Sequence, residues 1–180
     1  MKFKYCPICG GKLVEKFSYD EGGVPYCPKD DIMYFDTPKP CAIVAVVKDD
    51  KILLLKQSYI FKHSKVLVSG YVTNGETVED TVLREVKEET GIVVNNPEYL
   101  GSYYLASREI IMLTFMVKYE SGDIIKSDEV EWVDWSNLED ALCEMCEDEI
   151  GKSVVKKVLK NIGYNDKRAY RCDDGSCELK

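Results

Sequence analysis

The sequence predicts an α/β fold in which helices cover a mixed β-sheet, preceded by a small cysteine-containing unit. Three observations support this fold class. Apolar runs of strand length alternate with amphipathic segments of helical period along most of the chain. Two cysteine turns precede the first long apolar run, and the segment DTPKP (36–40) that separates them from it is typical of a hinge. We therefore expect domains at residues 1–36 and 37–165, followed by a flexible tail at 166–180.

Composition excludes several classes of protein. The net charge of −8 opposes contact with phosphate backbones and no basic patch is evident, so general nucleic-acid binding is not expected. The longest apolar run, residues 42–47, is too short to cross a membrane, and no apolar signal region follows the first residues. Eight cysteines in 180 residues are too few for a disulfide scaffold. We expect a cytoplasmic protein with reduced cysteines and no membrane partner.

The first half of the main domain contains three expected strands. The runs CAIVAVV (41–47) and KILLLKQ (51–57) are joined by Lys48-Asp49-Asp50, which is typical of a hairpin. The run VLVSGYV (66–72) is a further strand that enters a glycine turn.

A helix is expected over Val78–Thr90. Its apolar stripe comprises Val78, Val82, Leu83 and Val86. Thr77 is a candidate N-cap with Asp80 three residues later, and Gly91 fits a left-handed C-cap. The helix is therefore bounded at both ends by local signals.

The remaining segments complete an alternating pattern. Strands are expected at residues 98–107, 110–120 and 129–135, and helices at 138–149 and 153–162. Within the first of these helices, Cys143 and Cys146 are expected to be partly buried thiols, because a metal-binding knuckle does not form in a helix.

The helix at 78–90 carries an unusual cluster of carboxylates. Glu85 faces both Glu88 and Glu89, and like charges at this spacing oppose helix formation. A solvated acidic face is the ordinary explanation for such a helix. A longer pattern points elsewhere: Gly70, five residues, Glu76, seven residues, and then REVKEETGI (84–92).

This spacing is similar to the Nudix box, so the chain resembles the Nudix hydrolases. The resemblance implies an α/β/α sandwich with a mixed sheet. It also implies hydrolysis of nucleoside diphosphates linked to another group, with Mg²⁺ or Mn²⁺ held by the box helix. Hard cations take oxygen ligands, and their charge would explain why the acidic cluster is tolerated.

The resemblance also implies roles for individual residues. It makes Glu85 and Glu89 the principal metal ligands, with Glu88 and the backbone carbonyl of Ser69 as further ligands. The three glutamates are also the candidate catalytic residues, and which of them is the general base stays open. Gly70, Glu76, Arg84 and Gly91 are the structural positions of the box, with Arg84 expected to pair with Glu76 rather than with substrate. A distal metal ligand is expected at Glu129, with Glu131 as the alternative.

The N-terminal cysteines predict a zinc ribbon within residues 1–36. Cys6 and Cys9 form a C-x2-C knuckle, and Cys27 begins a second knuckle whose fourth position is Asp30. Zn²⁺ prefers sulfur here but accepts a carboxylate oxygen. Two alternatives stay open: Asp31 replaces Asp30 as the fourth ligand, or the ribbon holds no metal.

A zinc ribbon joined to a Nudix domain resembles the NADH pyrophosphatase branch, over roughly residues 5–140. In that branch the signature SQPWPFPxS follows the box, whereas this chain has SYYLASREI (102–110) at the same place. Ser102 is retained, and Tyr103 and Tyr104 are candidates for stacking on a base or for packing in the core or an interface. The expected function is metal-dependent hydrolysis of a pyrophosphate bond in a small nucleotide-containing, NADH-like substrate. The alternative is a non-catalytic ligand-sensing or protein-interaction module, and a homodimer is a further candidate assembly.

Overall fold

The chain is described from a computed structural model that covers residues 3–164. These residues divide after Pro38 into two compact units, each with its own β-sheet. We call residues 3–38 the ribbon unit and residues 39–164 the main unit, and describe each separately. The tail expected at 166–180 lies outside the described residues. No helix within 3–164 is long and apolar enough to span a membrane.

The ribbon unit contains three antiparallel strands and a very small core. Its strands are β1 (Val14–Ser18), β2 (Gly22–Cys27) and β3 (Ile32–Met33), with a 3-10 turn at Tyr19–Glu21 between the first two. Among its described hydrophobic side chains, only Cys6, Val24 and Cys27 are buried. A unit of this size buries too little apolar surface to be stable without a cross-link such as a disulfide or a bound metal.

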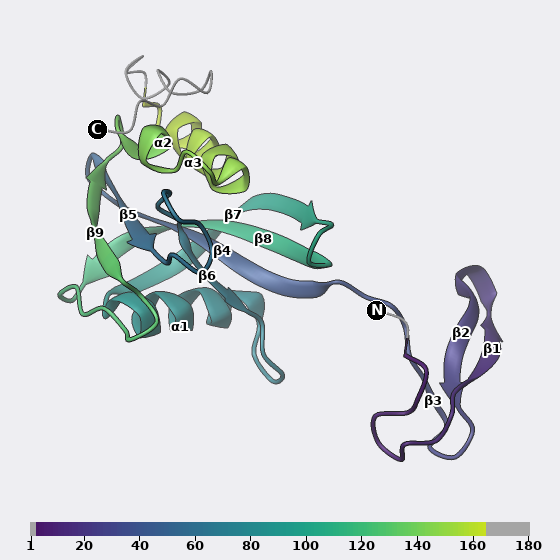
Figure 1. The fold of residues 1–180 in the computed structure, drawn as a ribbon. Helices are drawn as coiled ribbons and strands as arrows, with labels where there is room; N and C mark the ends of the chain where they lie inside the picture. The colour runs from purple at the N-terminus through teal and green to yellow at the C-terminus, as the bar shows by residue number, and fades with distance from the viewer. Residues whose placement is uncertain (1–2, 165–180) are drawn as a thin grey trace. The chain divides into compact units, whose positions relative to one another are not determined.

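The main unit is a mixed sheet between two layers of helix. Its strands are β4 (Lys39–Lys48), β5 (Lys51–Lys56), β6 (Val68–Tyr71), β7 (Val93–Leu105), β8 (Ile110–Ser121) and β9 (Trp132–Asn137). The strand order is β7-β8-β4-β5-β9 with β6 also paired to β4; β4 and β8 are parallel and the other pairs antiparallel. Helix α1 (Val78–Thr90) covers one face, and α2 (Ala141–Glu144) and α3 (Glu149–Asn161) cover the other (Figure 1). The expected α/β/α sandwich is therefore confirmed.

Strand β4 organises the region that later forms the site. Its first half pairs with β6, from Cys41 opposite Tyr71 to Val44 opposite Val68, whereas its last residues pair with β5. Strands β5 and β6 thus use successive stretches of β4. The segment 57–67 that connects them begins at Gln57, directly after β5.

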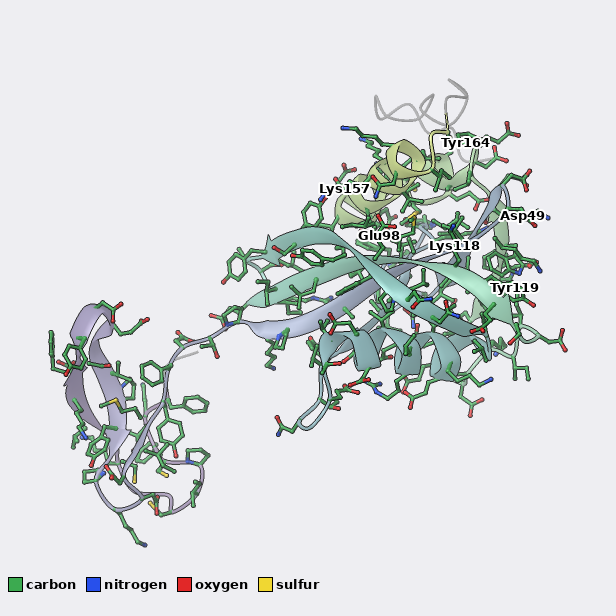
Figure 2. The ribbon with its side chains drawn as sticks, turned by 180° about the vertical axis from the view of Figure 1, so that it is seen from behind. Asp49, Glu98, Lys118, Tyr119, Lys157 and Tyr164 are labelled. Carbon is green, nitrogen blue, oxygen red and sulfur yellow. The ribbon has the colours of Figure 1, made fainter. Side chains whose placement is uncertain are left out.

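The core lies on both faces of the sheet. All four residues of the run Ile52–Leu55 in β5 are fully buried, as expected for a strand covered on both sides. Val82 and Val86 of α1 pack on one face, and the apolar side of α3 packs on the other. Lys157 of α3, which is labelled in Figure 2, donates to the Leu100 carbonyl at 3.0 Å and lies over the Tyr103 ring. These two contacts connect α3 to β7.

The bounds of α1 are confirmed and each expected strand is present, but β7 begins at Val93 rather than at 98, and β9 begins at Trp132 rather than at 129. The last helix begins at Glu149 rather than at 153. Two further local expectations are corrected. Leu83 is 37% exposed, so the buried stripe of α1 is narrower than its apolar residues suggest. The helix expected over 138–149 is only the single turn α2. It ends at Glu144 because Met145 (φ −103°, ψ 38°) leaves the helical conformation. Asp148 then accepts a hydrogen bond from the Gly151 amide and starts α3 as its N-cap.

Candidate functional site

Helix α1 is fixed at both ends by its own sequence. Thr77 and Asp80 form a reciprocal capping box: the Asp80 amide donates to the Thr77 hydroxyl, and the Thr77 amide donates to the Asp80 carboxylate. At the other end, Gly91 adopts a φ of 74°, and its amide donates to the Lys87 carbonyl. The residues of the acidic face therefore belong to one helix whose two ends are both defined by local hydrogen bonds.

Arg84 is the centre of an ion-pair network. Its Nε and Nη2 donate to both oxygens of Glu76, at 2.9 and 2.7 Å. Its Nη1 donates to Glu85 at 2.6 Å and to Glu88 at 3.1 Å. The bidentate pairing with Arg84 holds the pKa of the Glu76 carboxyl far below its usual range. Arg84 therefore joins the glycine turn, through Glu76, to α1.

Glu85 lies directly against the backbone of β6. A Cβ placed on Gly70 would lie 1.9 Å from the Glu85 Cδ, so a side chain at position 70 would occupy the space of this carboxylate. The glycine of the box is thus required for close approach. Burial raises the pKa of Glu85, and the hydrogen bond from Arg84 opposes that rise.

Glu89 is the most buried carboxylate of the cluster, with 6% of its surface exposed. Its Oε1 accepts a hydrogen bond from Gln57 Nε2 at 3.0 Å, and the backbone amide of Ser69 also faces its carboxylate. Its Oε2 has no hydrogen-bond partner within residues 3–164. Burial raises the pKa of Glu89 to about 7, with a smaller contribution from the negative charge of Glu85. A buried carboxylate with one unpartnered oxygen and acidic neighbours is a suitable ligand for a cation.

The two candidates for the distal ligand have different surroundings. The Glu131 carboxylate accepts hydrogen bonds from the Ser58 amide, at 2.9 Å, and from the Ser58 hydroxyl. Glu129 is exposed, and its charge contributes to the raised pKa of Glu89, so it lies near that carboxylate. The Ser127 amide donates to the Glu89 carbonyl at 3.3 Å and anchors the loop that carries Glu129. Glu129 is therefore the better placed of the two to join the cluster.

A cavity of about 240 Å³ adjoins this cluster. Ser69 belongs to both, because it lines the cavity and its amide faces Glu89. The apolar walls include Ile43, Ile60, Phe61, Leu67, Leu105 and Met112. Three acidic residues at and just before the start of α3 also line the cavity: Glu147, Asp148 and Glu149. The cavity can accept a flat apolar group while an attached anion lies toward the carboxylates.

The residues expected to contact substrate on β7 do not line this cavity. The described residues that line the cavity do not include Ser102, Tyr103 or Tyr104. Tyr103 packs against the core on the α3 side beneath Lys157, and Tyr104 is 62% exposed. Tyr103 lies opposite Met112 in the β7–β8 register, and Met112 is a cavity residue.

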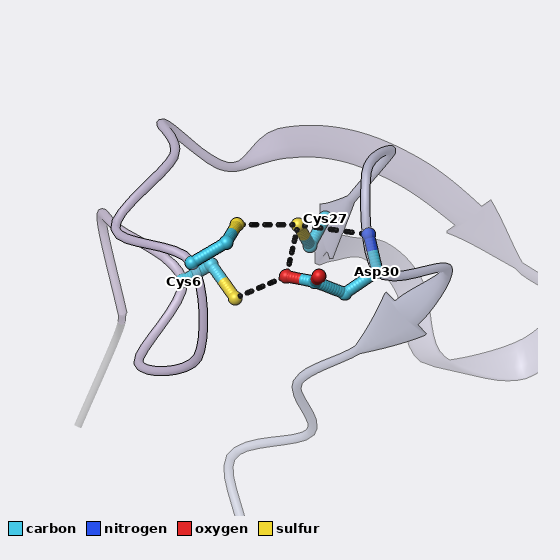
Figure 3. A group of neighbouring side chains, drawn as sticks. Cys6, Cys27 and Asp30 are labelled. Carbon is cyan, nitrogen blue, oxygen red and sulfur yellow. Dashed lines mark hydrogen bonds between the residues drawn. The ribbon is translucent and has the colours of Figure 1, made fainter.

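The ribbon unit brings its four expected zinc ligands together. One sulfur or carboxylate atom from each of Cys6, Cys9, Cys27 and Asp30 lies within 4.8 Å of all the others. Figure 3 labels three of these residues, Cys6, Cys27 and Asp30. Cys9 Sγ and Cys27 Sγ are 3.6 Å apart, and the Asp30 carboxylate lies 3.1 and 3.2 Å from the sulfurs of Cys6 and Cys27. Tetrahedral zinc with bonds of roughly 2.3 Å separates its ligands by roughly 3.8 Å, so the donor set fits this ion.

Neighbouring groups distinguish Asp30 from Asp31. Asp31 accepts a hydrogen bond from the Tyr26 hydroxyl at 2.7 Å and is 83% exposed, away from the sulfurs. The Tyr34 hydroxyl lies 3.0 Å from Cys6 Sγ, an interaction that raises the pKa of Tyr34 to about 12. Sequence reasoning missed Tyr34, since no motif links it to the knuckles.

The cysteines expected to be thiols in the main unit differ from each other. Cys146 is free, as expected. Cys143 is disulfide-bonded, which corrects both the expectation of a thiol at that position and the expectation that all cysteines are reduced.

Comparison with known proteins identifies the family. The model of the NUDIX domain matches residues 37–158, which is about two thirds of the chain. The chain belongs to the NUDIX domain family. The main unit is therefore a Nudix domain, and α1 carries its box.

Curated relatives come from several bacteria. The NAD-capped RNA hydrolase NudC of Photobacterium profundum is 38% identical over 120 residues, covering 67% of this chain and 44% of that protein. The protein of the same name from Vibrio cholerae is 32% identical over 164 residues, covering 90% of this chain and 60% of that protein. The chain thus spans about half the length of the curated relatives it matches. These relatives support the NADH pyrophosphatase branch.

Solved structures show the same fold. A NUDIX hydrolase from Nitrosomonas europaea superposes with a TM-score of 0.72 at 22% identity, covering 89% of this chain and 94% of that one. A UDP-X diphosphatase superposes with a TM-score of 0.61 at 22% identity, covering 73% and 66%. At these identities the similarity establishes the architecture and no more.

Proposed function

We propose that this chain catalyses the metal-dependent hydrolysis of a pyrophosphate bond in a nucleoside diphosphate linked to another moiety. The observation that carries the proposal is the buried Glu89 carboxylate, with one unpartnered oxygen, next to Glu85 and beside a cavity. The names of the curated relatives support a substrate with an NAD-type end.

The proposed cation ligands are Glu85, Glu88 and Glu89 on α1, with Glu129 from the neighbouring loop and the Ser69 carbonyl from β6. A divalent cation bound there would screen the charge of the pyrophosphate and lower the pKa of a water nucleophile. The protein holds the carboxylates in position through the Arg84 network and through the close contact of Glu85 with Gly70. Glu89, whose pKa is near neutrality without metal, is able to hold or release a proton in the working pH range.

The cavity beside Ser69 is the proposed place for the base or an equivalent flat group. Its apolar walls exclude water, and its edge at Ser69 leads to the carboxylates. Three residues of β7 are expected to contact substrate, and among them Tyr103 pairs with a cavity residue, Met112. We therefore propose Tyr103 as the main substrate contact of this strand. Ser102 and Tyr104 are proposed to contact parts of the substrate outside the cavity.

The ribbon unit is proposed to hold structural Zn²⁺ through its three cysteines and Asp30. Its very small apolar core supports this role, because a bound metal would contribute directly to its folding free energy. Cytoplasmic location, where the cysteine ligands stay reduced, is part of the same proposal.

The decisive experiment replaces Glu89 by Gln, which keeps the shape and removes a charge. Release of mononucleotide from dinucleotide pyrophosphates, including NADH, is measured with Mg²⁺ and Mn²⁺. Turnover should fall by about 10²–10⁴-fold, since metals supply several kcal/mol of transition-state stabilisation and each 1.4 kcal/mol is tenfold. Glu79→Gln is the matched control, because Glu79 is an exposed glutamate in the first turn of the same helix.

Equal turnover in Glu89→Gln and wild type would remove Glu89 from the site. Absence of turnover in wild type on the whole panel, together with binding of a dinucleotide, would instead favour the non-catalytic ligand-sensing module.

A further inference from the structure

We infer that Gln57 is a positioning residue of the cation site, an inference that rests on the proposed function. Gln57 Nε2 donates a hydrogen bond to Glu89 Oε1 at 3.0 Å. The two residues are separated by 32 positions in the chain, and their exposed fractions are 1% and 6%. No position of the Nudix box includes Gln57, and no sequence motif marks it.

The amide of Gln57 fixes which oxygen of Glu89 is available to a ligand. Oε1 is occupied by the Gln57 N–H. Oε2 makes no hydrogen bond within the described chain, although the Ser69 amide faces the carboxylate. A buried carboxylate oxygen without a partner is costly, so it marks the place where a cation or a further donor completes the site. Ligating carboxylates are commonly held by such outer hydrogen bonds, which orient them for the metal.

The surrounding backbone holds Gln57 itself in place. Its carbonyl accepts hydrogen bonds from the amides of Ile60 and Phe61, at 2.9 and 3.3 Å, and thus closes the turn after β5. Ile60 and Phe61 line the cavity beside the carboxylates. Gln57 therefore contacts the cation site through its side chain and the cavity wall through its backbone.

The remaining acceptor of Gln57 supports the same role. Its Oε1 is buried and has no partner among residues 3–164, so the side chain uses only its donor within the described protein. An apolar side chain would fill the same space without leaving an unpaired acceptor. A role in holding Glu89 in position therefore explains this buried amide better than a role in packing alone.

The test compares Gln57→Met with wild type in the full chain. Methionine keeps the length of the side chain, removes both the donor and the acceptor of the amide, and does not ligate hard cations. Mn²⁺ binding is measured by electron paramagnetic resonance of free Mn²⁺, and the shift in Tm on adding Mn²⁺ is recorded. Affinity should fall by about 10–100-fold, as for other outer hydrogen bonds of metal ligands. Thr114→Val is the matched control, because the Thr114 hydroxyl is a buried donor that bonds the Gly101 carbonyl away from the cluster.

Turnover gives a second readout that a structural role would not produce. The loss in Gln57→Met should be greatest at limiting Mn²⁺ and should shrink as Mn²⁺ is raised. Wild-type Mn²⁺ affinity in Gln57→Met, with or without a lower Tm, would overturn the positioning role alone. Failure of wild type itself to bind Mn²⁺ would overturn the proposed function as well.

Discussion

At the scale of single residues, Glu89 shows the cost in stability that the proposed cation site would carry. Without a metal, burial raises the pKa of Glu89 from 4.5 to about 7. Below about pH 4.5 the carboxyl is protonated in both the folded and the unfolded chain, so folding does not bury a negative charge at this position. As the pH rises from about 4.5 to about 7, the unfolded chain loses the proton first, and the free energy of unfolding falls.

This linkage gives a prediction for the metal-free protein. Relative to Glu89→Gln, wild type should lose about 2–3 kcal/mol of unfolding free energy between pH 4.5 and pH 7.5, because one pKa unit corresponds to about 1.4 kcal/mol. Urea unfolding at several pH values, in buffer without divalent cations, measures the difference. Tryptophan fluorescence is a suitable signal, since both tryptophans, Trp132 and Trp135, lie in the Nudix domain. Parallel pH profiles for the two proteins would contradict a raised pKa at Glu89.

At the scale of elements, the contact between α1 and β6 decides where Glu85 points. The Cβ of an alanine at position 70 would overlap the Glu85 carboxylate. The obstructing group is the end of a flexible side chain and not backbone, so it can move aside without unfolding the sheet. In Gly70→Ala we therefore expect a change of less than about 1 kcal/mol in the free energy of unfolding, together with markedly weaker Mn²⁺ binding.

Isothermal titration with Mn²⁺ and urea unfolding of the same preparation separate these two effects. A large loss of stability with unchanged Mn²⁺ affinity would show that the backbone of β6 had moved and that Glu85 had kept its place.

At the scale of the whole molecule, the two units depend on different sources of stability. The clusters of buried side chains that form the main core all belong to residues 42–159, whereas the ribbon unit buries only three hydrophobic residues. Removal of zinc should therefore abolish amide protection in the ribbon strands and leave the tryptophan unfolding transition of the Nudix domain unchanged. Hydrogen exchange with and without a chelator measures this.

The two neighbouring aspartates provide the control. Asp30→Ala should lower the zinc content of the purified protein, and Asp31→Ala should leave it unchanged, because only Asp30 lies among the sulfurs. Equal zinc content in both variants would exclude Asp30 as a ligand.

The sequence by itself determined the features that depend on neighbours a few positions away in the chain. Helix α1 and its caps at Thr77 and Gly91 follow from side chains within one turn, and both were predictable. The grouping of Cys6, Cys9, Cys27 and Asp30 was also predictable, because two short knuckles bring ligands together in a known way.

Only the tertiary structure decided which residues from distant parts of the chain contact helix α1 and its carboxylates. Gln57 reaches Glu89 because β5 and β6 use successive stretches of β4, so the end of β5 comes to lie beside α1. The cavity forms where four separate parts of the chain converge, and neither the cavity nor the exposure of Leu83 has a signal in a local pattern. The physical reason is that strand register and layer packing, which bring residues dozens of positions apart into contact, depend on the whole sheet rather than on any one segment.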